Sequence, residues 1–406
     1  MEYNLSIFVP ALMGVNAFLD SDQFGGSEFY RFFLKFIEST YRIIDLFMEA
    51  PPRYRKNIEH VIYLKELHQR VRERLNQLPP SRMNMVKFNL FFLPAIYFGL
   101  YILAVTYSAN YLLFLLLYSL MGLMTVVIFC ELIHELCHNN VFRSKKLNSA
   151  AFMLFDLLGA NSYIWRLRHL RSHHRYPNVQ DWDTDIEQKG PIAVYHDEDL
   201  NEFIKYQNIY VFFLYPLFMI NWLLVRDFRD YFAKDRIANK RFDIPGIEYF
   251  KLFFFKILYI FLMVGVPRIY GDVTLLESFF GLVVLTVSGS MLAMIVLLTP
   301  HVNEGNEFPA PNEAGEFENS WFMHQLKTTN DLTSSNWFTR NFMGNFNYHL
   351  SHHFFPNISA VYAPEVTEVI KEFLDEHDLP YKAYSIRASL WKHFQLIRRN
   401  AMAMRK

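Results

Sequence analysis

Histidines at helical spacing are the first chemical feature of this sequence. His349, His352 and His353 stand at positions i, i+3 and i+4. They fall on one face of an α-helix, because four residues advance about 400° around the helix axis. Imidazole is a good ligand for iron, zinc and copper. The triplet therefore indicates a transition-metal site and leaves the metal open.

Further histidines occur in matching clusters. One cluster runs from His134 to His138, a second from His169 to His174, and His301 stands alone after an apolar segment. The candidate ligands are His134, His138, His169, His173, His174, His301, His349, His352 and His353. A zinc site needs only three or four protein ligands. Nine candidates therefore predict two metal ions with four or five ligands each.

Two other kinds of metal chemistry match the first cluster. His134-Glu135-Leu136-Cys137-His138 fits the motif in which two histidines hold zinc and the glutamate is the general base of a metalloprotease. This alternative needs only one further ligand and leaves six histidines without a role. Glu131 and Glu135 also precede His134 and His138 by three residues, as in carboxylate-bridged di-iron bundles, but that motif requires separate helices. A metal carrier should hold its ligands inside membrane helices, whereas these clusters lie at helix ends and in polar segments.

Apolar segments must position these clusters. Five of them approach the length that spans a hydrocarbon core of about 30 Å, at residues 88–107, 111–133, 206–225, 249–266 and 275–299. The linker after 206–225 is rich in Lys and Arg, which places it in the cytosol and 206–225 along the interface. We therefore expect an all-α integral membrane protein with four transmembrane helices in two hairpins, interfacial helices and a cytosolic helical cap that holds the metal site.

The chain divides into three expected parts. Residues 1–87 form N-terminal cytosolic or interfacial helices, 88–360 form the membrane domain with the histidine clusters, and 361–406 form C-terminal cytosolic helices. Formal net charge is zero, so no global field attracts nucleic acid. The lipid bilayer is the expected surrounding.

Over roughly residues 88–384 the sequence resembles the membrane fatty acid desaturases with three histidine boxes. The clusters at 134–138, 169–174 and 349–353 match the boxes in order, spacing and position relative to the hairpins. Longer stretches are similar to bacterial linoleoyl-CoA-type acyl desaturases, namely 156–169, 176–178, 181–185, 301–304 and 324–329. The third box departs from the front-end members of that subgroup, because His349 stands where they often have Gln.

The resemblance implies a chemistry and its partners. Two iron ions would use O₂ and two electrons to introduce a double bond into a long-chain acyl-CoA or acyl-lipid. A hydroxylase or ketolase acting on lipid-like substrates would use the same irons and is the alternative. The sequence lacks the His-Pro-Gly-Gly segment of a fused cytochrome b5 domain. We therefore expect a separate electron donor of the ferredoxin, flavodoxin or cytochrome b5 type, and an active site facing the cytosol, in a bacterial inner membrane rather than the endoplasmic reticulum.

Side chains near the boxes are candidates for substrate contacts. Aromatic rings could line an acyl tunnel and arginines could pair with the phosphates of CoA; the same residues could anchor the protein at the interface or face anionic lipids or an acidic electron carrier. They are Tyr163, Trp165, Arg166, Arg168, Arg171, Trp321 and Trp337. Asp156, Asp185 and His324 could orient the N–H groups of metal ligands, and a purely structural role is the alternative.

Overall fold

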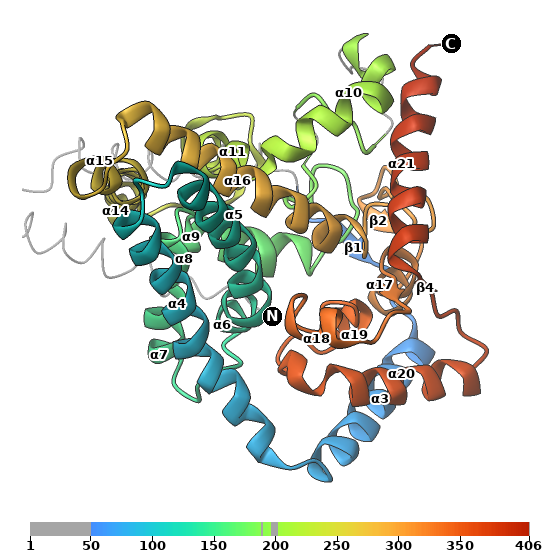
Figure 1. The fold of residues 1–406 in the computed structure, drawn as a ribbon. Coiled ribbons are helices and arrows are strands. Elements are labelled where there is room, and N and C mark those ends of the chain that lie inside the picture. Colours follow the sequence, from blue (N-terminus) through green and yellow to red (C-terminus); the bar gives the residue numbers. More distant parts are fainter. Residues whose placement is uncertain (1–49, 188–189, 196–201, 406) are drawn as a thin grey trace, which may run out of the picture. The chain divides into compact units, whose positions relative to one another are not determined.

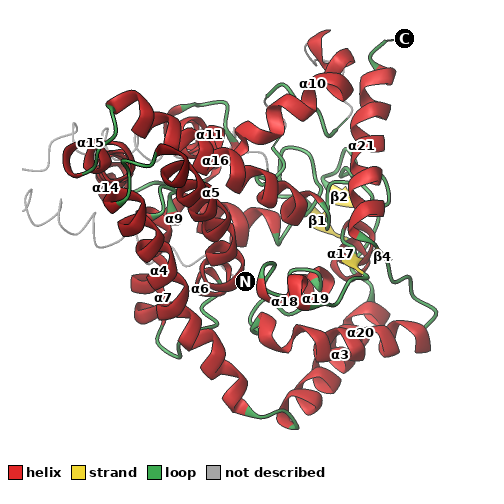
Figure 2. Cartoon of the chain, viewed as in Figure 1, coloured by secondary structure: helices red, strands yellow, loops and turns green. Residues whose placement is uncertain are grey.

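The computed structural model describes residues 50–187, 190–195 and 202–405 (Figure 1). The helices expected before residue 50 lie outside the described residues. Residues 54–312 and 316–405 belong to one compact unit, to which the description below refers. Helices make up nearly all of its regular structure, which confirms the all-α prediction (Figure 2). The strands are two residues long: β1 Arg53–Tyr54, β2 Glu316–Phe317, β3 Asp331–Leu332 and β4 Ala383–Tyr384, with β3 and β4 paired in parallel.

Five helices among the described residues are long and apolar enough to cross a membrane. They are Pro80–Thr106, Tyr111–Cys137, Glu202–Arg241, Gly246–Tyr270 and Leu275–Leu298. The first consists of the turn η2 Pro80–Arg82 and α4 Met83–Thr106, the second of α5 Tyr111–Ile128, the π-helix η3 Phe129–Ile133 and α6 His134–Cys137. The fourth consists of α14 Gly246–Ile260, the π-helix η8 Phe261–Gly265 and α15 Val266–Tyr270, and the fifth is α16 Leu275–Leu298.

The first two and the last two of these helices form hairpins, as expected. Asn110 caps the start of α5 with its side chain, and Thr274 starts α16 in a reciprocal capping box with Glu277. The loops of the two hairpins meet, because the backbone N–H of Asp272 donates to Oγ of Ser108 at 2.7 Å. Both hairpins therefore turn at the same end of the helix bundle.

Small residues let α5 and α16 pack closely. A Cβ atom on Gly122 would lie 2.0 Å from the backbone oxygen of Leu285, so no larger residue fits there. Close by, Oγ of Ser288 donates to the backbone oxygen of Ser119 at 2.9 Å. Small residues at a helix interface are typical of packing in membranes, where close backbone approach replaces the hydrophobic effect.

The segment expected along the interface is a broken helix. Its pieces are η5 Glu202–Tyr206, α10 Gln207–Leu214, η6 Tyr215–Leu217, α11 Phe218–Asn221, the π-helix η7 Trp222–Arg226, α12 Asp227–Phe232 and α13 Ile237–Arg241. Pro216 lies in η6, where proline removes a backbone donor. α10 packs against the C-terminal helix α21 Ile386–Ala403, and α11 packs against α16.

The remaining helices connect the hairpins and form a cap. Between the hairpins lie α7 Lys145–Phe152, α8 Leu154–Leu157, α9 Ser162–Leu167 and the π-helix η4 Arg168–His173. The cap contains α3 Ile58–Asn76, α17 Trp321–Thr328, α18 Trp337–Asn341, α19 His349–Phe354, η9 Ala360–Tyr362 and α20 Ala363–Glu376. Leu67 and Val71 of α3 are buried against Ile370 and Phe373 of α20, which gives the cap its own apolar core. The helices expected within residues 361–406 are present as α20 and α21.

Candidate metal centre

The structure brings all nine candidate histidines together in two neighbouring groups. Group one consists of His134, His138, His169, His174 and His352, and group two of His173, His301, His349 and His353. Eight of the nine are buried, and His352 is partly buried. Residues from α6, η4, α19 and the end of α16 meet here, although the first and last histidines are more than 200 positions apart.

In group one, the Nε2 atoms face one another. Nε2 of His169 lies 3.2 Å from that of His134, 3.1 Å from that of His138 and 3.1 Å from that of His174. Nε2 of His352 lies 3.0 Å from Nε2 of His174. Two nitrogens that bind one metal at about 2.1 Å along perpendicular directions lie about 3.0 Å apart. The observed spacing is therefore that of nitrogens able to share a metal.

Group two has the same arrangement with fewer residues. Nε2 of His301 lies 2.9 Å from that of His353 and 2.8 Å from that of His349. The ring of His173 completes the group, with its centroid 4.7 Å from that of His301. Together the groups form a di-metal site with nitrogen donors, and imidazole suits iron, zinc, copper and nickel.

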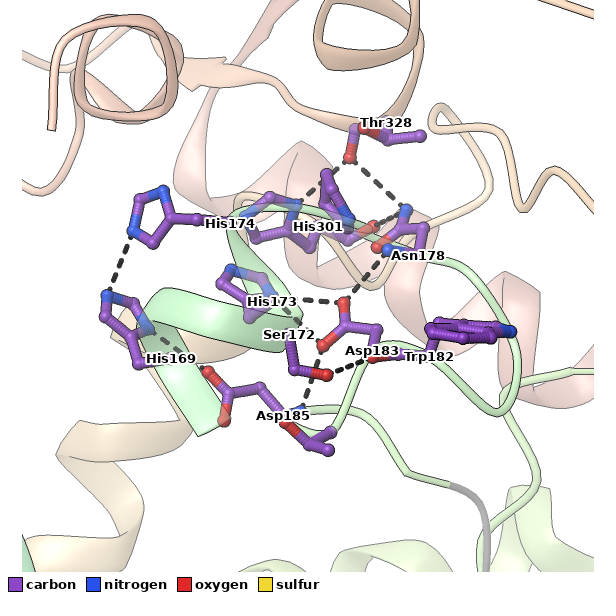
Figure 3. Close-up of polar contacts among 12 residues, drawn as sticks. His169, Ser172, His173, His174, Asn178, Trp182, Asp183, Asp185, His301 and Thr328 are labelled. Carbon is purple, nitrogen blue, oxygen red and sulfur yellow. Dashed lines mark hydrogen bonds and ion pairs between the residues drawn. The ribbon is translucent and has the colours of Figure 1, made fainter. Parts of the chain in front are cut away.

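A π-helix sorts the histidines of the second box. In η4 the backbone N–H of His174 donates to the oxygen of His169, five residues earlier, at 3.0 Å. In a π-helix, residues five apart therefore lie on the same face of the helix. In an α-helix they would be rotated by about 140° from each other around the helix axis. As a result His169 and His174 share group one, while His173 points into group two (Figure 3).

Four histidines are held through their second ring nitrogen. An oxygen accepts a hydrogen bond only from N–H, so in the neutral ring an Nδ1 that faces oxygen carries the proton and Nε2 keeps its lone pair for a metal. The pairs are His169 with Asp185 at 3.2 Å, His173 with Asp183 at 3.0 Å, His301 with the backbone oxygen of Thr328 at 3.1 Å, and His353 with Oε1 of Gln325 at 3.0 Å.

The protonation of these side chains also suits metal binding, which requires neutral imidazole. Burial, together with the neighbouring imidazoles, lowers the pKa of most of them well below its ordinary value; these are His138, His174, His301, His349, His352 and His353. Burial also lowers the pKa of His169, although Asp185 opposes it. For His173 burial acts in the same direction, but the Asp183 carboxylate outweighs it and raises the pKa.

Two adjoining cavities run from the histidines into the helix bundle. The histidine cavity touches His134, His169, His173, His301 and His349 and has an empty volume of about 740 Å³. The bundle cavity, of about 490 Å³, is lined almost wholly by apolar side chains of α5, α11 and α16 and their neighbours. The two cavities share Phe129, Phe218, Trp222 and Leu297 in their walls, so together they form one apolar route.

A polar cleft approaches the histidines from another direction. It has a volume of about 1610 Å³ including its open mouth, and its walls include Arg82, Glu131, Glu135 and Glu365. A smaller cavity lies between the cleft and the histidines. That cavity touches His134, His349 and His352, and it shares Gly344, Asn345, Ser359 and Ala360 with the cleft.

Comparison with known proteins gives the family. Residues 109–385 match the family model described as fatty acid desaturase. The chain belongs to the fatty acid desaturase family. Within the desaturases, the acyl-lipid (8-3)-desaturase of Physcomitrium patens is 30% identical over 321 residues, which cover 78% of this chain and 66% of the moss protein, just under two thirds of its length.

Two further desaturases are similar over most of this chain. The sn-1 linoleoyl-lipid 6-desaturase of Synechocystis sp. is 27% identical over 255 residues, 62% of this chain and 70% of that protein. The probable Delta(5) fatty acid desaturase C of Dictyostelium discoideum is 28% identical over 353 residues, 82% of this chain and 74% of that protein. This chain is thus a membrane protein of a lipid-modifying family, and the metalloprotease alternative is set aside.

The site also bears on how a desaturase chain crosses the membrane. Three candidate spans, Glu202–Arg241, Gly246–Tyr270 and Leu275–Leu298, lie between His174 and His301 in the sequence. Because both histidines belong to one centre, an even number of these segments crosses the membrane. Four crossings in two hairpins satisfy this condition and five do not. In that arrangement the broken helix 202–241 lies along the interface, and this placement stays a prediction.

Of the seven side chains expected near the substrate, two lie in the wall of the histidine cavity. Trp165 stacks on His169, with ring centroids 4.8 Å apart and planes at 17°. Arg168 also lines that cavity, but its guanidinium is buried between Asp185 and Asp230. This burial and pairing were not foreseen from the sequence.

The structure places the other five elsewhere. Tyr163 donates to the backbone oxygen of Asp243 at 3.2 Å, and Arg166 to that of Leu136 at 3.0 Å. Arg171 is exposed. Trp321 packs against Phe354 in the cap, and Trp337 is 69% exposed. Their part in substrate binding stays a prediction.

The three side chains expected to orient ligands have different surroundings in the structure. Asp185 contacts His169; burial opposes its ionisation, but the hydrogen bond from His169 and the charge of Arg168 hold the pKa of its carboxyl below the ordinary value. Asp156 accepts the backbone N–H of Ser162 at 3.0 Å, next to the start of α9. His324 contacts the backbone oxygen of Pro177 through Nε2 at 2.9 Å.

Sequence reasoning missed two side chains that hold ligand rings, Gln325 and Asp183. Gln325 directly follows His324, and no spacing rule distinguishes it. Asp183 is one of several acidic residues close together in the sequence. The contact that distinguishes it is the hydrogen bond from the backbone N–H of Asn178, at 2.9 Å. The Asn178 side chain also donates to the backbone oxygens of His301 and Thr328, each at 3.2 Å, and so ties the second box to the end of α16 (Figure 3).

Proposed function

We propose that this protein is an O₂-dependent di-iron desaturase that introduces a double bond into a long-chain acyl group of a membrane lipid. The observation that carries the proposal is the position of two histidine groups at the head of one apolar route into the helix bundle. Two of the relatives described above are named as desaturases of lipid-linked acyl chains. That likeness favours an acyl-lipid over an acyl-CoA as substrate.

We propose the nine histidines as the iron ligands, five in group one and four in group two. When bound, the two irons with O₂ and two electrons supply the oxidising strength that removal of hydrogen from an unactivated CH₂ group needs. The protein's own residues position and protect this chemistry. Asp183, Asp185, Gln325 and the Thr328 backbone orient ligand rings, and burial excludes water that would divert the oxidant.

The acyl chain is proposed to occupy the histidine and bundle cavities. The almost wholly apolar walls of the bundle cavity favour a hydrocarbon chain by the hydrophobic effect. Phe129, Phe218 and Trp222 stand where the two cavities adjoin and would fix the direction of the chain. Trp165, stacked on His169, would form the wall opposite the reacting carbons.

We place the active site on the cytosolic face. The basic stretch at residues 226–241, the last part of the broken helix, supports this, because Lys- and Arg-rich linkers stay in the cytosol and Arg236 of this stretch pairs with Asp230 close to the second box. A bacterial inner membrane is proposed from the resemblance to bacterial acyl desaturases. A one-electron carrier of the ferredoxin, flavodoxin or cytochrome b5 type is proposed as the donor.

Lipid mass spectrometry after expression in a host of known lipid composition tests the function. We expect lipids lighter by two hydrogens, with one new double bond in an acyl chain, and no such product with the His352→Ala variant. Fragmentation of the product also gives the double-bond position and the lipid that carries the chain. Hydroxy or keto lipids in place of the new double bond would contradict desaturation and favour a hydroxylase or ketolase.

A further inference from the structure

A buried series of ion pairs leads from the metal centre to α12. Nδ1 of His169 lies 3.2 Å from one oxygen of Asp185, whose other oxygen accepts from Nη2 of Arg168 at 3.1 Å. Nη1 of Arg168 donates to Asp230 at 3.2 Å. The second oxygen of Asp230 accepts from Nε of Arg236 at 2.9 Å. Four side chains thus connect α12 and its following loop to one imidazole.

Burial makes this connection stiff. The side chains of Arg168 and Asp230 are 1% and 0% exposed, so neither charge can turn to water for a substitute partner. The guanidinium of Arg168 is planar and directs its N–H groups along fixed lines. When Nη1 donates to Asp230, the direction of the N–H groups on Nη2 is fixed. This direction determines where the Asp185 carboxylate accepts its hydrogen bond. Asp185 then presents its other oxygen to His169.

The carboxylate of Asp185 needs this support, because it is the least buried member of the series. Its side chain is 23% exposed, and it follows the acidic run in a loop rather than standing on a helix. Its backbone N–H donates to Asp183 at 2.9 Å, which fixes its main chain. The direction of the side chain depends on Arg168. Asp230 holds the Nη1 end of the Arg168 guanidinium, and Nη2 also donates to the backbone oxygen of Thr184 at 3.3 Å.

The same helix offers a natural control. Asp227 stands one turn before Asp230 on α12 and is likewise 0% exposed. Its carboxylate pairs with Nζ of Lys256 on α14 at 2.6 Å, and Lys256 also donates to the backbone oxygen of Gly159 at 2.5 Å. Asp227 pairs with one buried cation and Asp230 with two, Arg168 and Arg236, but only Asp230 is joined by hydrogen bonds to His169.

We propose that Asp230 is a positioning residue of the metal centre. Through Arg168 and Asp185 it fixes the orientation of the His169 imidazole and so slows the loss of metal from group one. The proposal rests on the ligand set proposed above. It gives Arg168 a role inside the protein, holding Asp185, in place of the substrate phosphate considered from the sequence.

The test compares Asp230→Asn with Asp227→Asn in the purified, metal-loaded full chain. Each substitution removes one buried negative charge that faces a buried cation, so both should lower the thermal unfolding midpoint of the metal-free protein. Only Asp230→Asn should speed the loss of one metal per chain to a chelator, by about 10- to 100-fold, as expected when the support of a ligand is removed. It should also change the Mössbauer signal of one iron and leave the other unchanged.

A double substitution tests whether the effect passes through Asp185. Asp185→Asn should speed metal loss at least as much as Asp230→Asn, and the double variant should be no faster than Asp185→Asn alone, because the two residues act in series. If the double variant lost metal faster, by the product of the two single effects, the two residues would act independently and the proposed series would be contradicted. Equal metal-loss rates for Asp230→Asn and Asp227→Asn would overturn the proposal.

A second variant covers the case in which Asp230→Asn does not fold. Arg168→Met combined with Asp230→Leu removes both charges together, which buried pairs often tolerate. This variant should fold and still lose one metal quickly; slow, wild-type loss would overturn the proposal. The readout needs only a bound metal. A wild-type chain that retains metal but makes no double bond would refute the proposed function and leave the positioning role intact.

Discussion

The two histidine groups differ in how firmly their rings are held. In group two, His173, His301 and His353 each place Nδ1 against an oxygen of the protein, whereas Nδ1 of His349 has no hydrogen-bond partner among the described residues; all four members are buried. In group one, His169 has such a partner, Nδ1 of His174 has no hydrogen-bond partner among the described residues, and His352 is partly exposed beside the cavity that leads to the polar cleft.

This difference has a consequence for metal binding. Rings already fixed by a second hydrogen bond lose little freedom when they bind a metal, so the metal is held more tightly. Group two is therefore expected to keep its metal, and group one to exchange its metal through the side that faces the polar cleft. Group one compensates with a fifth histidine.

Removing one ligand from each group should give unequal results. His353→Ala leaves three histidines in group two, and we expect no detectable product and about one metal per chain lost. His138→Ala leaves four in group one, so that chain should retain a measurable fraction of the second metal. Metal content by mass spectrometry and product by lipid analysis check both. Equal metal loss in the two variants would remove the distinction between the groups.

Asp183→Asn weakens the support of group two. The amide keeps the size of the side chain but not the charge that faces His173, and a carboxylate behind a ligand is typically worth about 10- to 100-fold in metal affinity. We expect that reduction for one metal, measured by competition with a chelator of known affinity. Asp375→Asn, at a residue exposed at the end of α20, is the control and should leave affinity unchanged. Wild-type affinity in Asp183→Asn would mean that His173 needs no such support.

Chelation of the wild-type protein should proceed in two phases. The first metal should leave at least about 10-fold faster than the second, since ligand support of this kind is worth that much. In the His352→Ala variant the fast phase should accelerate further, while the slow phase keeps its rate. A single phase for both metals would contradict the ranking of the groups.

Gln325→Leu should have the smallest effect. It removes the acceptor of a neutral hydrogen bond from Nδ1 of His353, worth about 0.5–1.5 kcal/mol, or about 10-fold at most. Chelator competition should show a reduction of that size in one metal, with the circular dichroism spectrum unchanged. If Gln325→Leu reduced metal affinity as much as Asp183→Asn, the charge of Asp183 would not be what distinguishes its support of His173 from the support of His353 by Gln325.

Local patterns account for what the sequence revealed. Apolar length predicted the hairpin helices, and helical spacing brought out the histidines of α6 and α19, because both signals depend on neighbouring residues. The division of the adjacent residues His173 and His174 between groups was beyond such rules. It depends on the i to i+5 bond of a π-helix, which has no sequence signature.

Long-range contacts were equally hidden. Gln325 reaches His353 across the cap, and Arg168 is enclosed by Asp230, 62 positions later. Tertiary packing decides both contacts. The burial of Arg168 is the clearest case, because an arginine beside a histidine box reads from the sequence as a surface group that meets phosphate.

Mössbauer spectroscopy of the purified protein, loaded with isotopic iron and with metal content measured in the same sample, tests the central claim most directly. Two irons per chain in two distinguishable environments of equal population are predicted, one for each histidine group. A single tightly bound zinc without iron, or one iron per chain in a single environment, would contradict the account.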